Sequence, residues 1–126
     1  MSEEKHNSAA AVSAAALAYL GDSVWEVLIR RRLVLSGIAQ PSEAALAYVT
    51  AAAQSDAVER LMPHLTEEEE DAYRRGRNSV HGNVPKRATV AQYRRATGLE
   101  ALFGYLELCG SAERMDELIT LAFPSL

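Results

Sequence analysis

Residues 17–26 read LAYLGDSVWE, and the aspartate among them does not suit the helix that their spacing predicts. At about 3.6 residues per turn, the helix surface around Asp22 is formed by Ala15, Ala18, Tyr19, Trp25, Glu26 and Ile29. Only one of these six neighbours is polar. The opposite side is an ordinary core stripe of Leu17, Leu20, Val24 and Leu28. The side that should face water is therefore apolar as well, and it carries an acid.

A second acid, Glu100, lies in the similarly apolar stretch LEALFGYLEL at residues 99–108. If the two helices pack side by side, the two carboxylates could converge on one divalent cation, because hard cations prefer carboxylate oxygens. Gly21, Gly98 and Gly104 flank the acids and would let the two backbones approach closely. The alternative is that each acid pairs with a buried arginine. The spacing alone leaves both interpretations open.

Glu26 follows Asp22 by one helical turn, and two carboxylates at this spacing repel each other unless a cation lies between them. Glu26 is therefore either a third metal ligand or a solvated glutamate at the edge of the site. Other chemistry has little support in the sequence. No Ser or Cys has a His at a spacing typical of nucleophilic catalysis, there is no glycine-rich phosphate loop, and the histidines are scattered at positions 6, 64 and 81.

The composition is that of a soluble globular protein. The chain has 126 residues, 48% of them hydrophobic and 24% charged, which suits a single domain over residues 1–126 with a flexible start at 1–8. The single cysteine cannot form an internal disulfide, which favours a reducing compartment. Residues 9–20 resemble a signal-peptide core, but Glu3 and Glu4 precede them, and no run reaches the ~18 apolar residues of a membrane span. We expect a cytoplasmic protein without a membrane partner.

Basic residues are concentrated in one segment, although the formal net charge is −4. Seven of the 13 basic residues lie between Tyr73 and Arg95, where there is no Asp or Glu. The candidate phosphate and sugar contacts in this segment are Arg74, Arg75, Arg77, Asn78, Lys86, Arg87, Tyr93, Arg94 and Arg95. The alternative is a solvated face. The segment lacks an aromatic platform for single-stranded bases, so duplex RNA, which is read mainly through its backbone and shape, fits it better.

The periodicity predicts an all-α fold, because no stretch of useful length alternates with period two. Thr66 and Glu69 form a capping-box pattern at the start of one helix, and Gly37 is placed to end another. We expect a break near Gln54 and a mobile basic loop at residues 78–88. The expected helices span about residues 8–35, as one helix or two abutting ones, 41–62, 67–76, 90–109 and 112–122.

Several of these stretches resemble motifs of the ribonuclease III family. LAYLGDSVWE is similar to the family's signature helix, whose Leu-Gly-Asp-Ser core carries a catalytic aspartate. LEALFGYLEL resembles its Glu-Ala-Leu-hydrophobic-Gly helix, which carries a catalytic glutamate. RRGRN at 74–78 and VPKRATVAQYRRATGLEALFGYLEL at 84–108 are similar to the Mini-ribonuclease III branch, which lacks an appended double-stranded-RNA-binding domain. The resemblance covers roughly residues 14–122.

The resemblance implies that Asp22 and Glu100 are the catalytic residues and the ligands of Mg²⁺, with Mn²⁺ as a substitute. Ala15, Ala18 and Thr97 stand where ribonuclease III proper has further acids. The resemblance therefore leaves open whether one metal ion or two are bound, because two carboxylates and water can hold one Mg²⁺ but a second only with help.

The resemblance also implies a ribonuclease III-type fold and a homodimer in which Tyr19, Trp25 and Ile29 face the partner. The implied activity is cleavage of double-stranded RNA, with precursor ribosomal RNA of the large-subunit, 23S type as the substrate. The alternative is a catalytically silent module of this fold that binds structured RNA or a ribosomal partner. The missing acids favour that alternative, and the retained pair argues against it. A plain helical interaction domain would leave the acid-free basic segment unexplained.

Overall fold

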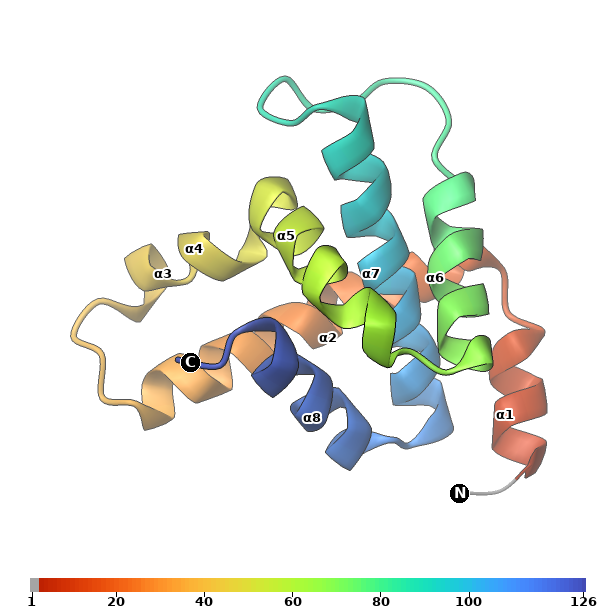
Figure 1. The fold of residues 1–126 in the computed structure, drawn as a ribbon, viewed down its shortest axis with the longest axis horizontal. Coiled ribbons are helices and arrows are strands. Elements are labelled where there is room, and N and C mark those ends of the chain that lie inside the picture. The colour runs from red at the N-terminus through yellow and green to blue at the C-terminus, as the bar shows by residue number, and fades with distance from the viewer. Residues whose placement is uncertain (1–2) are drawn as a thin grey trace.

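The computed structural model describes residues 3–126, which fold into helices without any strand (Figure 1). The all-α prediction is confirmed. In chain order the elements are α1 (Glu3–Ala10), α2 (Ala14–Leu35), α3 (Pro41–Ala44), α4 (Leu46–Val49), α5 (Ala51–Leu61), the 3₁₀ turn η1 (Met62–His64), α6 (Glu67–Asn78), α7 (Val90–Cys109) and α8 (Ala112–Ala122). No single helix in the described range is long and apolar enough to cross a membrane. Helices α1 and α2 meet that criterion only when taken together, and a bend of 112° separates them.

Helix α7 forms the centre of the fold, and α1, α2, α5 and α6 pack around it (Figure 1). Thr89 starts the helix through a capping box with Gln92, and Gly110 ends it in the left-handed conformation, at φ +73°. Leu102 and Phe103 near its middle are completely buried. The predicted bounds of this helix, 90–109, are confirmed.

The close packing around α7 depends on glycines. A Cβ atom added to Gly21 would lie 1.6 Å from the carbonyl oxygen of Glu100, and one added to Gly104 would lie 2.0 Å from a backbone oxygen of α2. Gly98 allows α6 to pack closely on α7, since a Cβ there would be 2.7 Å from the ring of Tyr73. Because real Cβ atoms do not approach so closely, α2 and α7 must meet backbone to backbone. The close approach expected at these glycines is confirmed.

Two segments differ from the prediction. The start of the chain, expected to be flexible at residues 1–8, contains helix α1 from Glu3 onward, and residues 1–2 lie outside the described range. The helices of the region 41–62 break at Ala45 and at Thr50, and not near Gln54. The reason is that the Thr50 hydroxyl accepts a hydrogen bond of 3.2 Å from a backbone N–H in the first turn of α5 and so starts that helix.

Trp25 and Ile29 lie in the core of the chain itself, so the prediction that they face a partner subunit is wrong. Both are 0% exposed. The Trp25 indole donates its N–H to the Tyr48 carbonyl at 2.9 Å and packs edge-on against Phe103, with ring centroids 4.9 Å apart. Helix α2 is apolar on two sides because α7 covers one side and the α4 region covers another. Tyr19, the third residue of that prediction, is 85% exposed.

Candidate active site

Asp22 on α2 and Glu100 on α7 come together where the two helices cross. The carbonyl of Glu100 lies against Gly21, the residue before Asp22. Glu100 is partly buried and Asp22 is exposed. Burial, and then the negative charge of Asp22, raise the pKa of Glu100 from 4.5 to about 8. A hydrogen bond with Gln54 lowers this pKa, and the charge of Glu26 raises it further.

The two acids face each other without a cationic side chain between them. Among residues 3–126 neither carboxylate forms an ion pair, so the buried arginine partner considered from the sequence is not present in the described structure. Two like charges at close range in a partly desolvated site are unfavourable unless a proton or a cation joins them. Their oxygens are the ligands that Mg²⁺ prefers. The donor set of this pair therefore fits a hard divalent cation.

Glu26 is not grouped with Asp22 and Glu100 in the described structure, and its role as a metal ligand stays a prediction. Its carboxylate pairs with Arg30, with Oε2 2.8 Å from Nη2 and 3.0 Å from Nε. No three His, Cys, Asp or Glu side chains in the described part of the chain are grouped closely enough to hold one metal ion. Glu26 instead lines an open pocket beside Asp22. The Thr97 hydroxyl donates to the Tyr93 carbonyl at 2.9 Å.

Gln54 of α5 belongs to the same site, its neighbour Ser55 lies beside the site, and the sequence analysis missed both. Gln54 and Ser55 are each 4% exposed. Gln54 interacts with the Glu100 carboxyl, and Ser55 accepts a hydrogen bond of 3.3 Å from Arg95. The signal that could have identified them is their position in AAAQSDAV at residues 51–58, where adjacent polar residues interrupt an alanine-rich helix.

Part of the basic segment makes hydrogen bonds within the fold. Arg75 donates hydrogen bonds of 3.2 and 2.9 Å to the Ala10 and Val12 carbonyls, which fixes the corner between α1 and α2. Arg95 is directed to Ser55 and links α7 to α5. Arg75 and Arg95 thus have partners inside the chain, and their contact with phosphates stays a prediction.

The other basic residues lie on the surface. Arg74 pairs with Asp71 at 3.3 Å on the same helix, and Arg77 donates to the Asn78 side chain at 3.3 Å. Tyr93 is partly buried. Within the described basic segment, three exposed cations have no ion-pair partner, and they lie in the loop at 79–89 and the first turns of α7: Lys86, Arg87 and Arg94.

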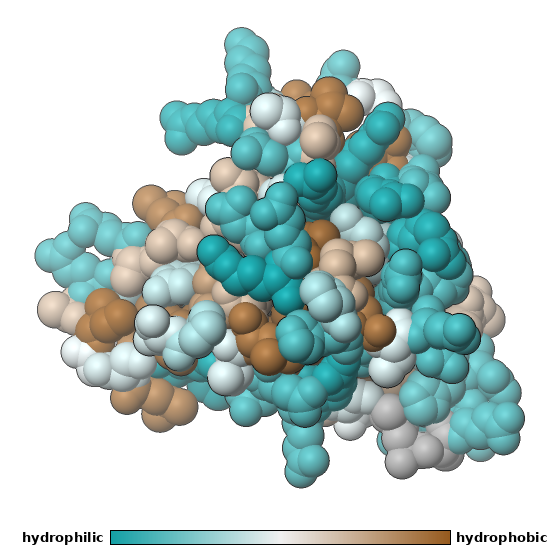
Figure 2. Space-filling model, in the orientation of Figure 1, coloured by the Kyte–Doolittle hydropathy of each residue, from teal (hydrophilic) through white to brown (hydrophobic). Residues whose placement is uncertain are grey.

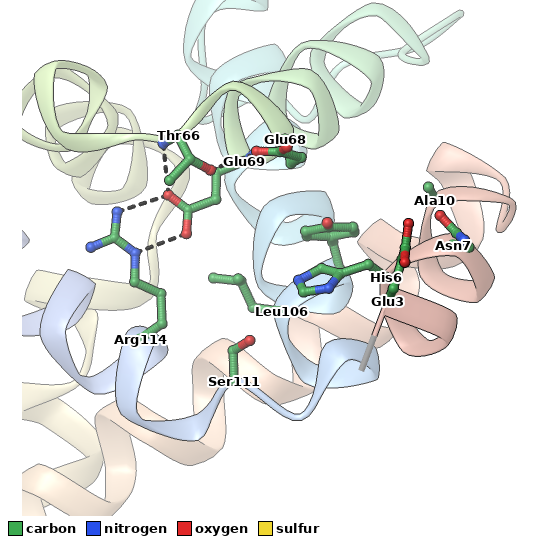
Figure 3. Close-up of a pocket in the computed structure, with 11 residues that line it drawn as sticks. Glu3, His6, Asn7, Ala10, Thr66, Glu68, Glu69, Leu106, Ser111 and Arg114 are labelled. Carbon is green, nitrogen blue, oxygen red and sulfur yellow. Dashed lines mark hydrogen bonds and ion pairs between the residues drawn. The ribbon is translucent and has the colours of Figure 1, made fainter. Parts of the chain in front are cut away.

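A second buried acid lies in a separate cavity among α1, α6, α7 and α8 (Figure 3). Glu69 is 5% exposed, and Arg114 donates to both of its carboxylate oxygens at 2.8 Å. The backbone N–H of Thr66 donates a further hydrogen bond of 2.9 Å. Burial alone would raise the pKa of Glu69, but the hydrogen bonds from Arg114 and Thr66 outweigh it and lower the pKa. The charge of this acid is thus compensated by Arg114 within the protein.

The family described as the Ribonuclease III domain matches residues 15–111, a range that contains both acids of the pair. A Mini-ribonuclease 3 of Symbiobacterium thermophilum is 47% identical over 109 residues, which are 84% of each chain. One of Brevibacillus brevis is 43% identical over 85% of this chain and 82% of its own. The chain belongs to the Mini-ribonuclease III branch of the ribonuclease III family. Family membership makes it a hydrolase of the endonuclease class.

The fold of this ribonuclease III domain also agrees with a solved structure. A crystal structure of a Fusobacterium nucleatum protein superposes with a TM-score of 0.82 at 29% sequence identity, covering 90% of this chain and 93% of that one. The two helices that resemble family motifs, α2 and α7, thus also lie in a fold that agrees with a solved structure. The prediction of a ribonuclease III-type fold is confirmed.

Proposed function

We propose that this chain is a divalent-metal-dependent endoribonuclease that cuts both strands of double-stranded RNA as a homodimer in the cytoplasm. The observation that carries the proposal is the convergence of Asp22 and Glu100 on one partly buried site without a cationic side chain. The resemblance of its motifs leads us to propose precursor ribosomal RNA of the large-subunit, 23S type as the substrate. The products would carry 5′-phosphate and 3′-hydroxyl ends with a short 3′ overhang.

Asp22 and Glu100 would hold a Mg²⁺ ion through their carboxylate oxygens, and Mn²⁺ could replace it. The bound cation would activate a water for in-line attack on the phosphodiester and stabilise the charge on the departing 3′ oxygen. Burial and the charge of Asp22 raise the pKa of Glu100 and so favour its protonated form in the metal-free protein, and this proton must leave for Glu100 to act as a ligand. The backbone contact at Gly21 holds the two carboxylates together before substrate arrives.

The exposed cations Lys86, Arg87 and Arg94 would contact the RNA backbone. Arg94 precedes Glu100 by six residues on α7, which is about 9 Å along the helix axis at about 1.5 Å per residue. A phosphate bound at Arg94 would therefore bring the duplex over the acid pair. Hydrophilic side chains dominate this end of the molecule, at the top of the view in Figure 2. Binding through so few phosphate contacts should weaken steeply with added salt.

The subunit interface in this proposal uses exposed apolar residues of α2 and α4, in place of Trp25 and Ile29. Val34 and Leu46 are 64% and 61% exposed and line a groove between the two helices. Apolar atoms gather on this side of the molecule, over α3, α4 and the end of α2 (Figure 2). Exposed apolar side chains gathered in one patch are typical of an interface between subunits. Tyr19 stays a predicted interface residue because of its high exposure.

The proposal is tested by cleavage of an end-labelled RNA duplex in Mg²⁺, comparing the wild type with Asp22→Asn and Glu100→Gln. RNA binding of all three proteins is measured in parallel. The proposal expects the wild type to cut both strands, and each amide variant to bind RNA without cutting it. An amide variant that cuts at the wild-type rate would contradict the role given to that acid.

A catalytically silent RNA-binding module is the second candidate, and one observation favours it. Thr97 stands where an acid would precede Glu100, and its hydroxyl donates to the Tyr93 carbonyl and supplies no carboxylate charge. The same assay separates the two candidates. If the wild type binds duplex RNA but does not cut it at any Mg²⁺ or Mn²⁺ concentration, the silent module replaces the nuclease.

A further inference from the structure

Three polar side chains are fully buried in the described structure, and two of them have partners that explain their burial. Glu69 is paired with Arg114, and Ser55 accepts a hydrogen bond from Arg95. The third, Gln54, is 4% exposed, and its interaction is with the Glu100 carboxyl. A buried amide needs hydrogen-bond partners, because leaving it unpaired costs free energy. The partner that Gln54 has is therefore an acid of the candidate active site.

The backbone around Gln54 is rigidly held. Helix α5 starts at the Thr50 cap and is anchored in the core by Ala57 and Leu61, which are 0% and 1% exposed. The adjacent hydrogen bond from Arg95 to Ser55 ties α5 to α7 five residues before the acid. On the other side of α7, the glycine contact fixes the Glu100 backbone against α2. Glu100 is thus held between two helices, by backbone contact with α2 and by an amide from α5.

We propose that Gln54 is a positioning residue, whose amide N–H donates to one oxygen of the Glu100 carboxylate and leaves the other oxygen available to a divalent cation. An amide suits this role better than an arginine would, because it fixes the carboxylate without neutralising its charge. The proposal rests on the proposed function, since it assumes that Glu100 binds a cation. It also replaces Glu26, which is paired with Arg30, as the third side chain of the site.

The test measures Mn²⁺ binding to the full chain without RNA, by the loss of the electron paramagnetic resonance signal of free Mn²⁺. The variants are Gln54→Met, which keeps the side-chain length but removes the donor, and Gln54→Asn, which keeps an amide that is too short to reach Glu100. Ser55→Ala is the matched control, because Ser55 is equally buried on the same helix but contacts Arg95 and not the acid pair. Urea unfolding of each variant records any loss of stability separately.

We expect both Gln54 variants to bind Mn²⁺ about 10- to 100-fold more weakly than the wild type, the usual cost of removing a group that orients a metal ligand. Ser55→Ala should lose stability but bind Mn²⁺ as the wild type does. In RNA cleavage, the Gln54 variants should need more Mg²⁺ for half-maximal rate and approach the wild-type rate at saturating Mg²⁺. A purely structural role would lower stability alone and would leave the metal requirement unchanged.

The outcomes separate this inference from the proposed function. If the wild type binds Mn²⁺ and both Gln54 variants bind it equally well, Gln54 is not a positioning residue and the proposed nuclease is unaffected. If Ser55→Ala weakens Mn²⁺ binding as much as the Gln54 variants do, the effect belongs to α5 packing and the inference is again overturned. If the wild type itself does not bind Mn²⁺, the metal-dependent function fails and this inference fails with it.

Discussion

Glu69 and Glu100 are both withdrawn from water by packed helices, yet their pKa values move in opposite directions. Arg114 and the Thr66 backbone supply hydrogen bonds to Glu69 and lower its pKa. Glu100 meets a second carboxylate, and burial and that charge raise its pKa to about 8. Burial alone therefore does not distinguish a structural acid from a functional one. What distinguishes them is whether the protein supplies the compensating positive charge or leaves it to a ligand.

The largest difference should appear in catalysis, when each of the two acids is changed to its amide. Glu100→Gln should lower the cleavage rate by about a thousandfold or more, because a metal ligand contributes several kcal/mol to transition-state stabilisation. Glu69→Gln should cut RNA at nearly the wild-type rate, since its partners all serve the fold. Rates on an end-labelled duplex at saturating Mg²⁺ check this. Equal losses in both variants would remove the distinction.

Stability should respond in the opposite sense. Glu69→Gln should lower the free energy of unfolding by about 3 kcal/mol, because it leaves Arg114 partly buried without its partner. Arg114→Met should give a similar loss, and the double variant should lose less than the sum, since both changes remove the same ion pair. Urea unfolding measures all three. Additive losses would show that the two side chains do not stabilise the fold as a pair.

The pH dependence of stability without metal should also have opposite signs at the two acids. An unfolded glutamate ionises near pH 4.5, whereas Glu100 keeps its proton until about pH 8, so its contribution is full below pH 4.5 and is lost as the pH rises toward 8. We expect the free energy of unfolding to fall by about 2 kcal/mol over this range, a value reduced for the solvent screening of this partly exposed group. Glu69 has a lowered pKa, so its contribution is present above pH 4.5 and is lost on acidification.

Unfolding in EDTA between pH 4.5 and 8 tests this pH dependence, with Glu100→Gln as the matched control. That variant should lose less stability over this range than the wild type, because it has no proton to release at position 100. Parallel curves for the two proteins would show that the acid pair does not carry the pH dependence.

The smallest effect should come from a comparison of two arginines, one with and one without an ion-pair partner, in RNA binding. Arg87→Ala removes an exposed cation without an ion-pair partner, and we expect weaker RNA binding and a salt dependence reduced by about 0.9 in log–log slope. Arg74→Ala removes a cation that is already paired with Asp71, and should change binding less. Filter binding at several salt concentrations distinguishes them. A larger effect at Arg74 would contradict the division of the basic segment into paired and free residues.

Local structural features could be predicted from the sequence where they depend on the type and spacing of a few residues. The Thr66 capping box, the bounds of α7 and the close approach at Gly21 all follow from residue type and spacing, and all are present in the structure. The glycines beside both acids indicated a close crossing, but the spacing left open whether the two acids converge or each pairs with an arginine.

The sequence could not predict which side chains become partners when distant segments pack together, or whether an apolar face is buried by its own chain or by a partner. Trp25 and Ile29 are apolar because their own chain buries them, and periodicity cannot tell that from burial by a partner. Arg75 has the same charge as Arg87, but its hydrogen bonds to the α1–α2 corner come from residues more than 60 positions away. Gln54 was missed because its partner Glu100 lies on another helix.

The backbone contact between Gly21 and Glu100 has a consequence for how this site tolerates sequence change. The two acids are brought together where two main chains touch. We expect substitutions at Leu102 and Phe103 to alter stability more than they alter the separation of the acids. A single methyl group at position 21 would instead push the helices apart and move both acids at once. We therefore expect the geometry of the proposed site to be most sensitive to changes at this crossing.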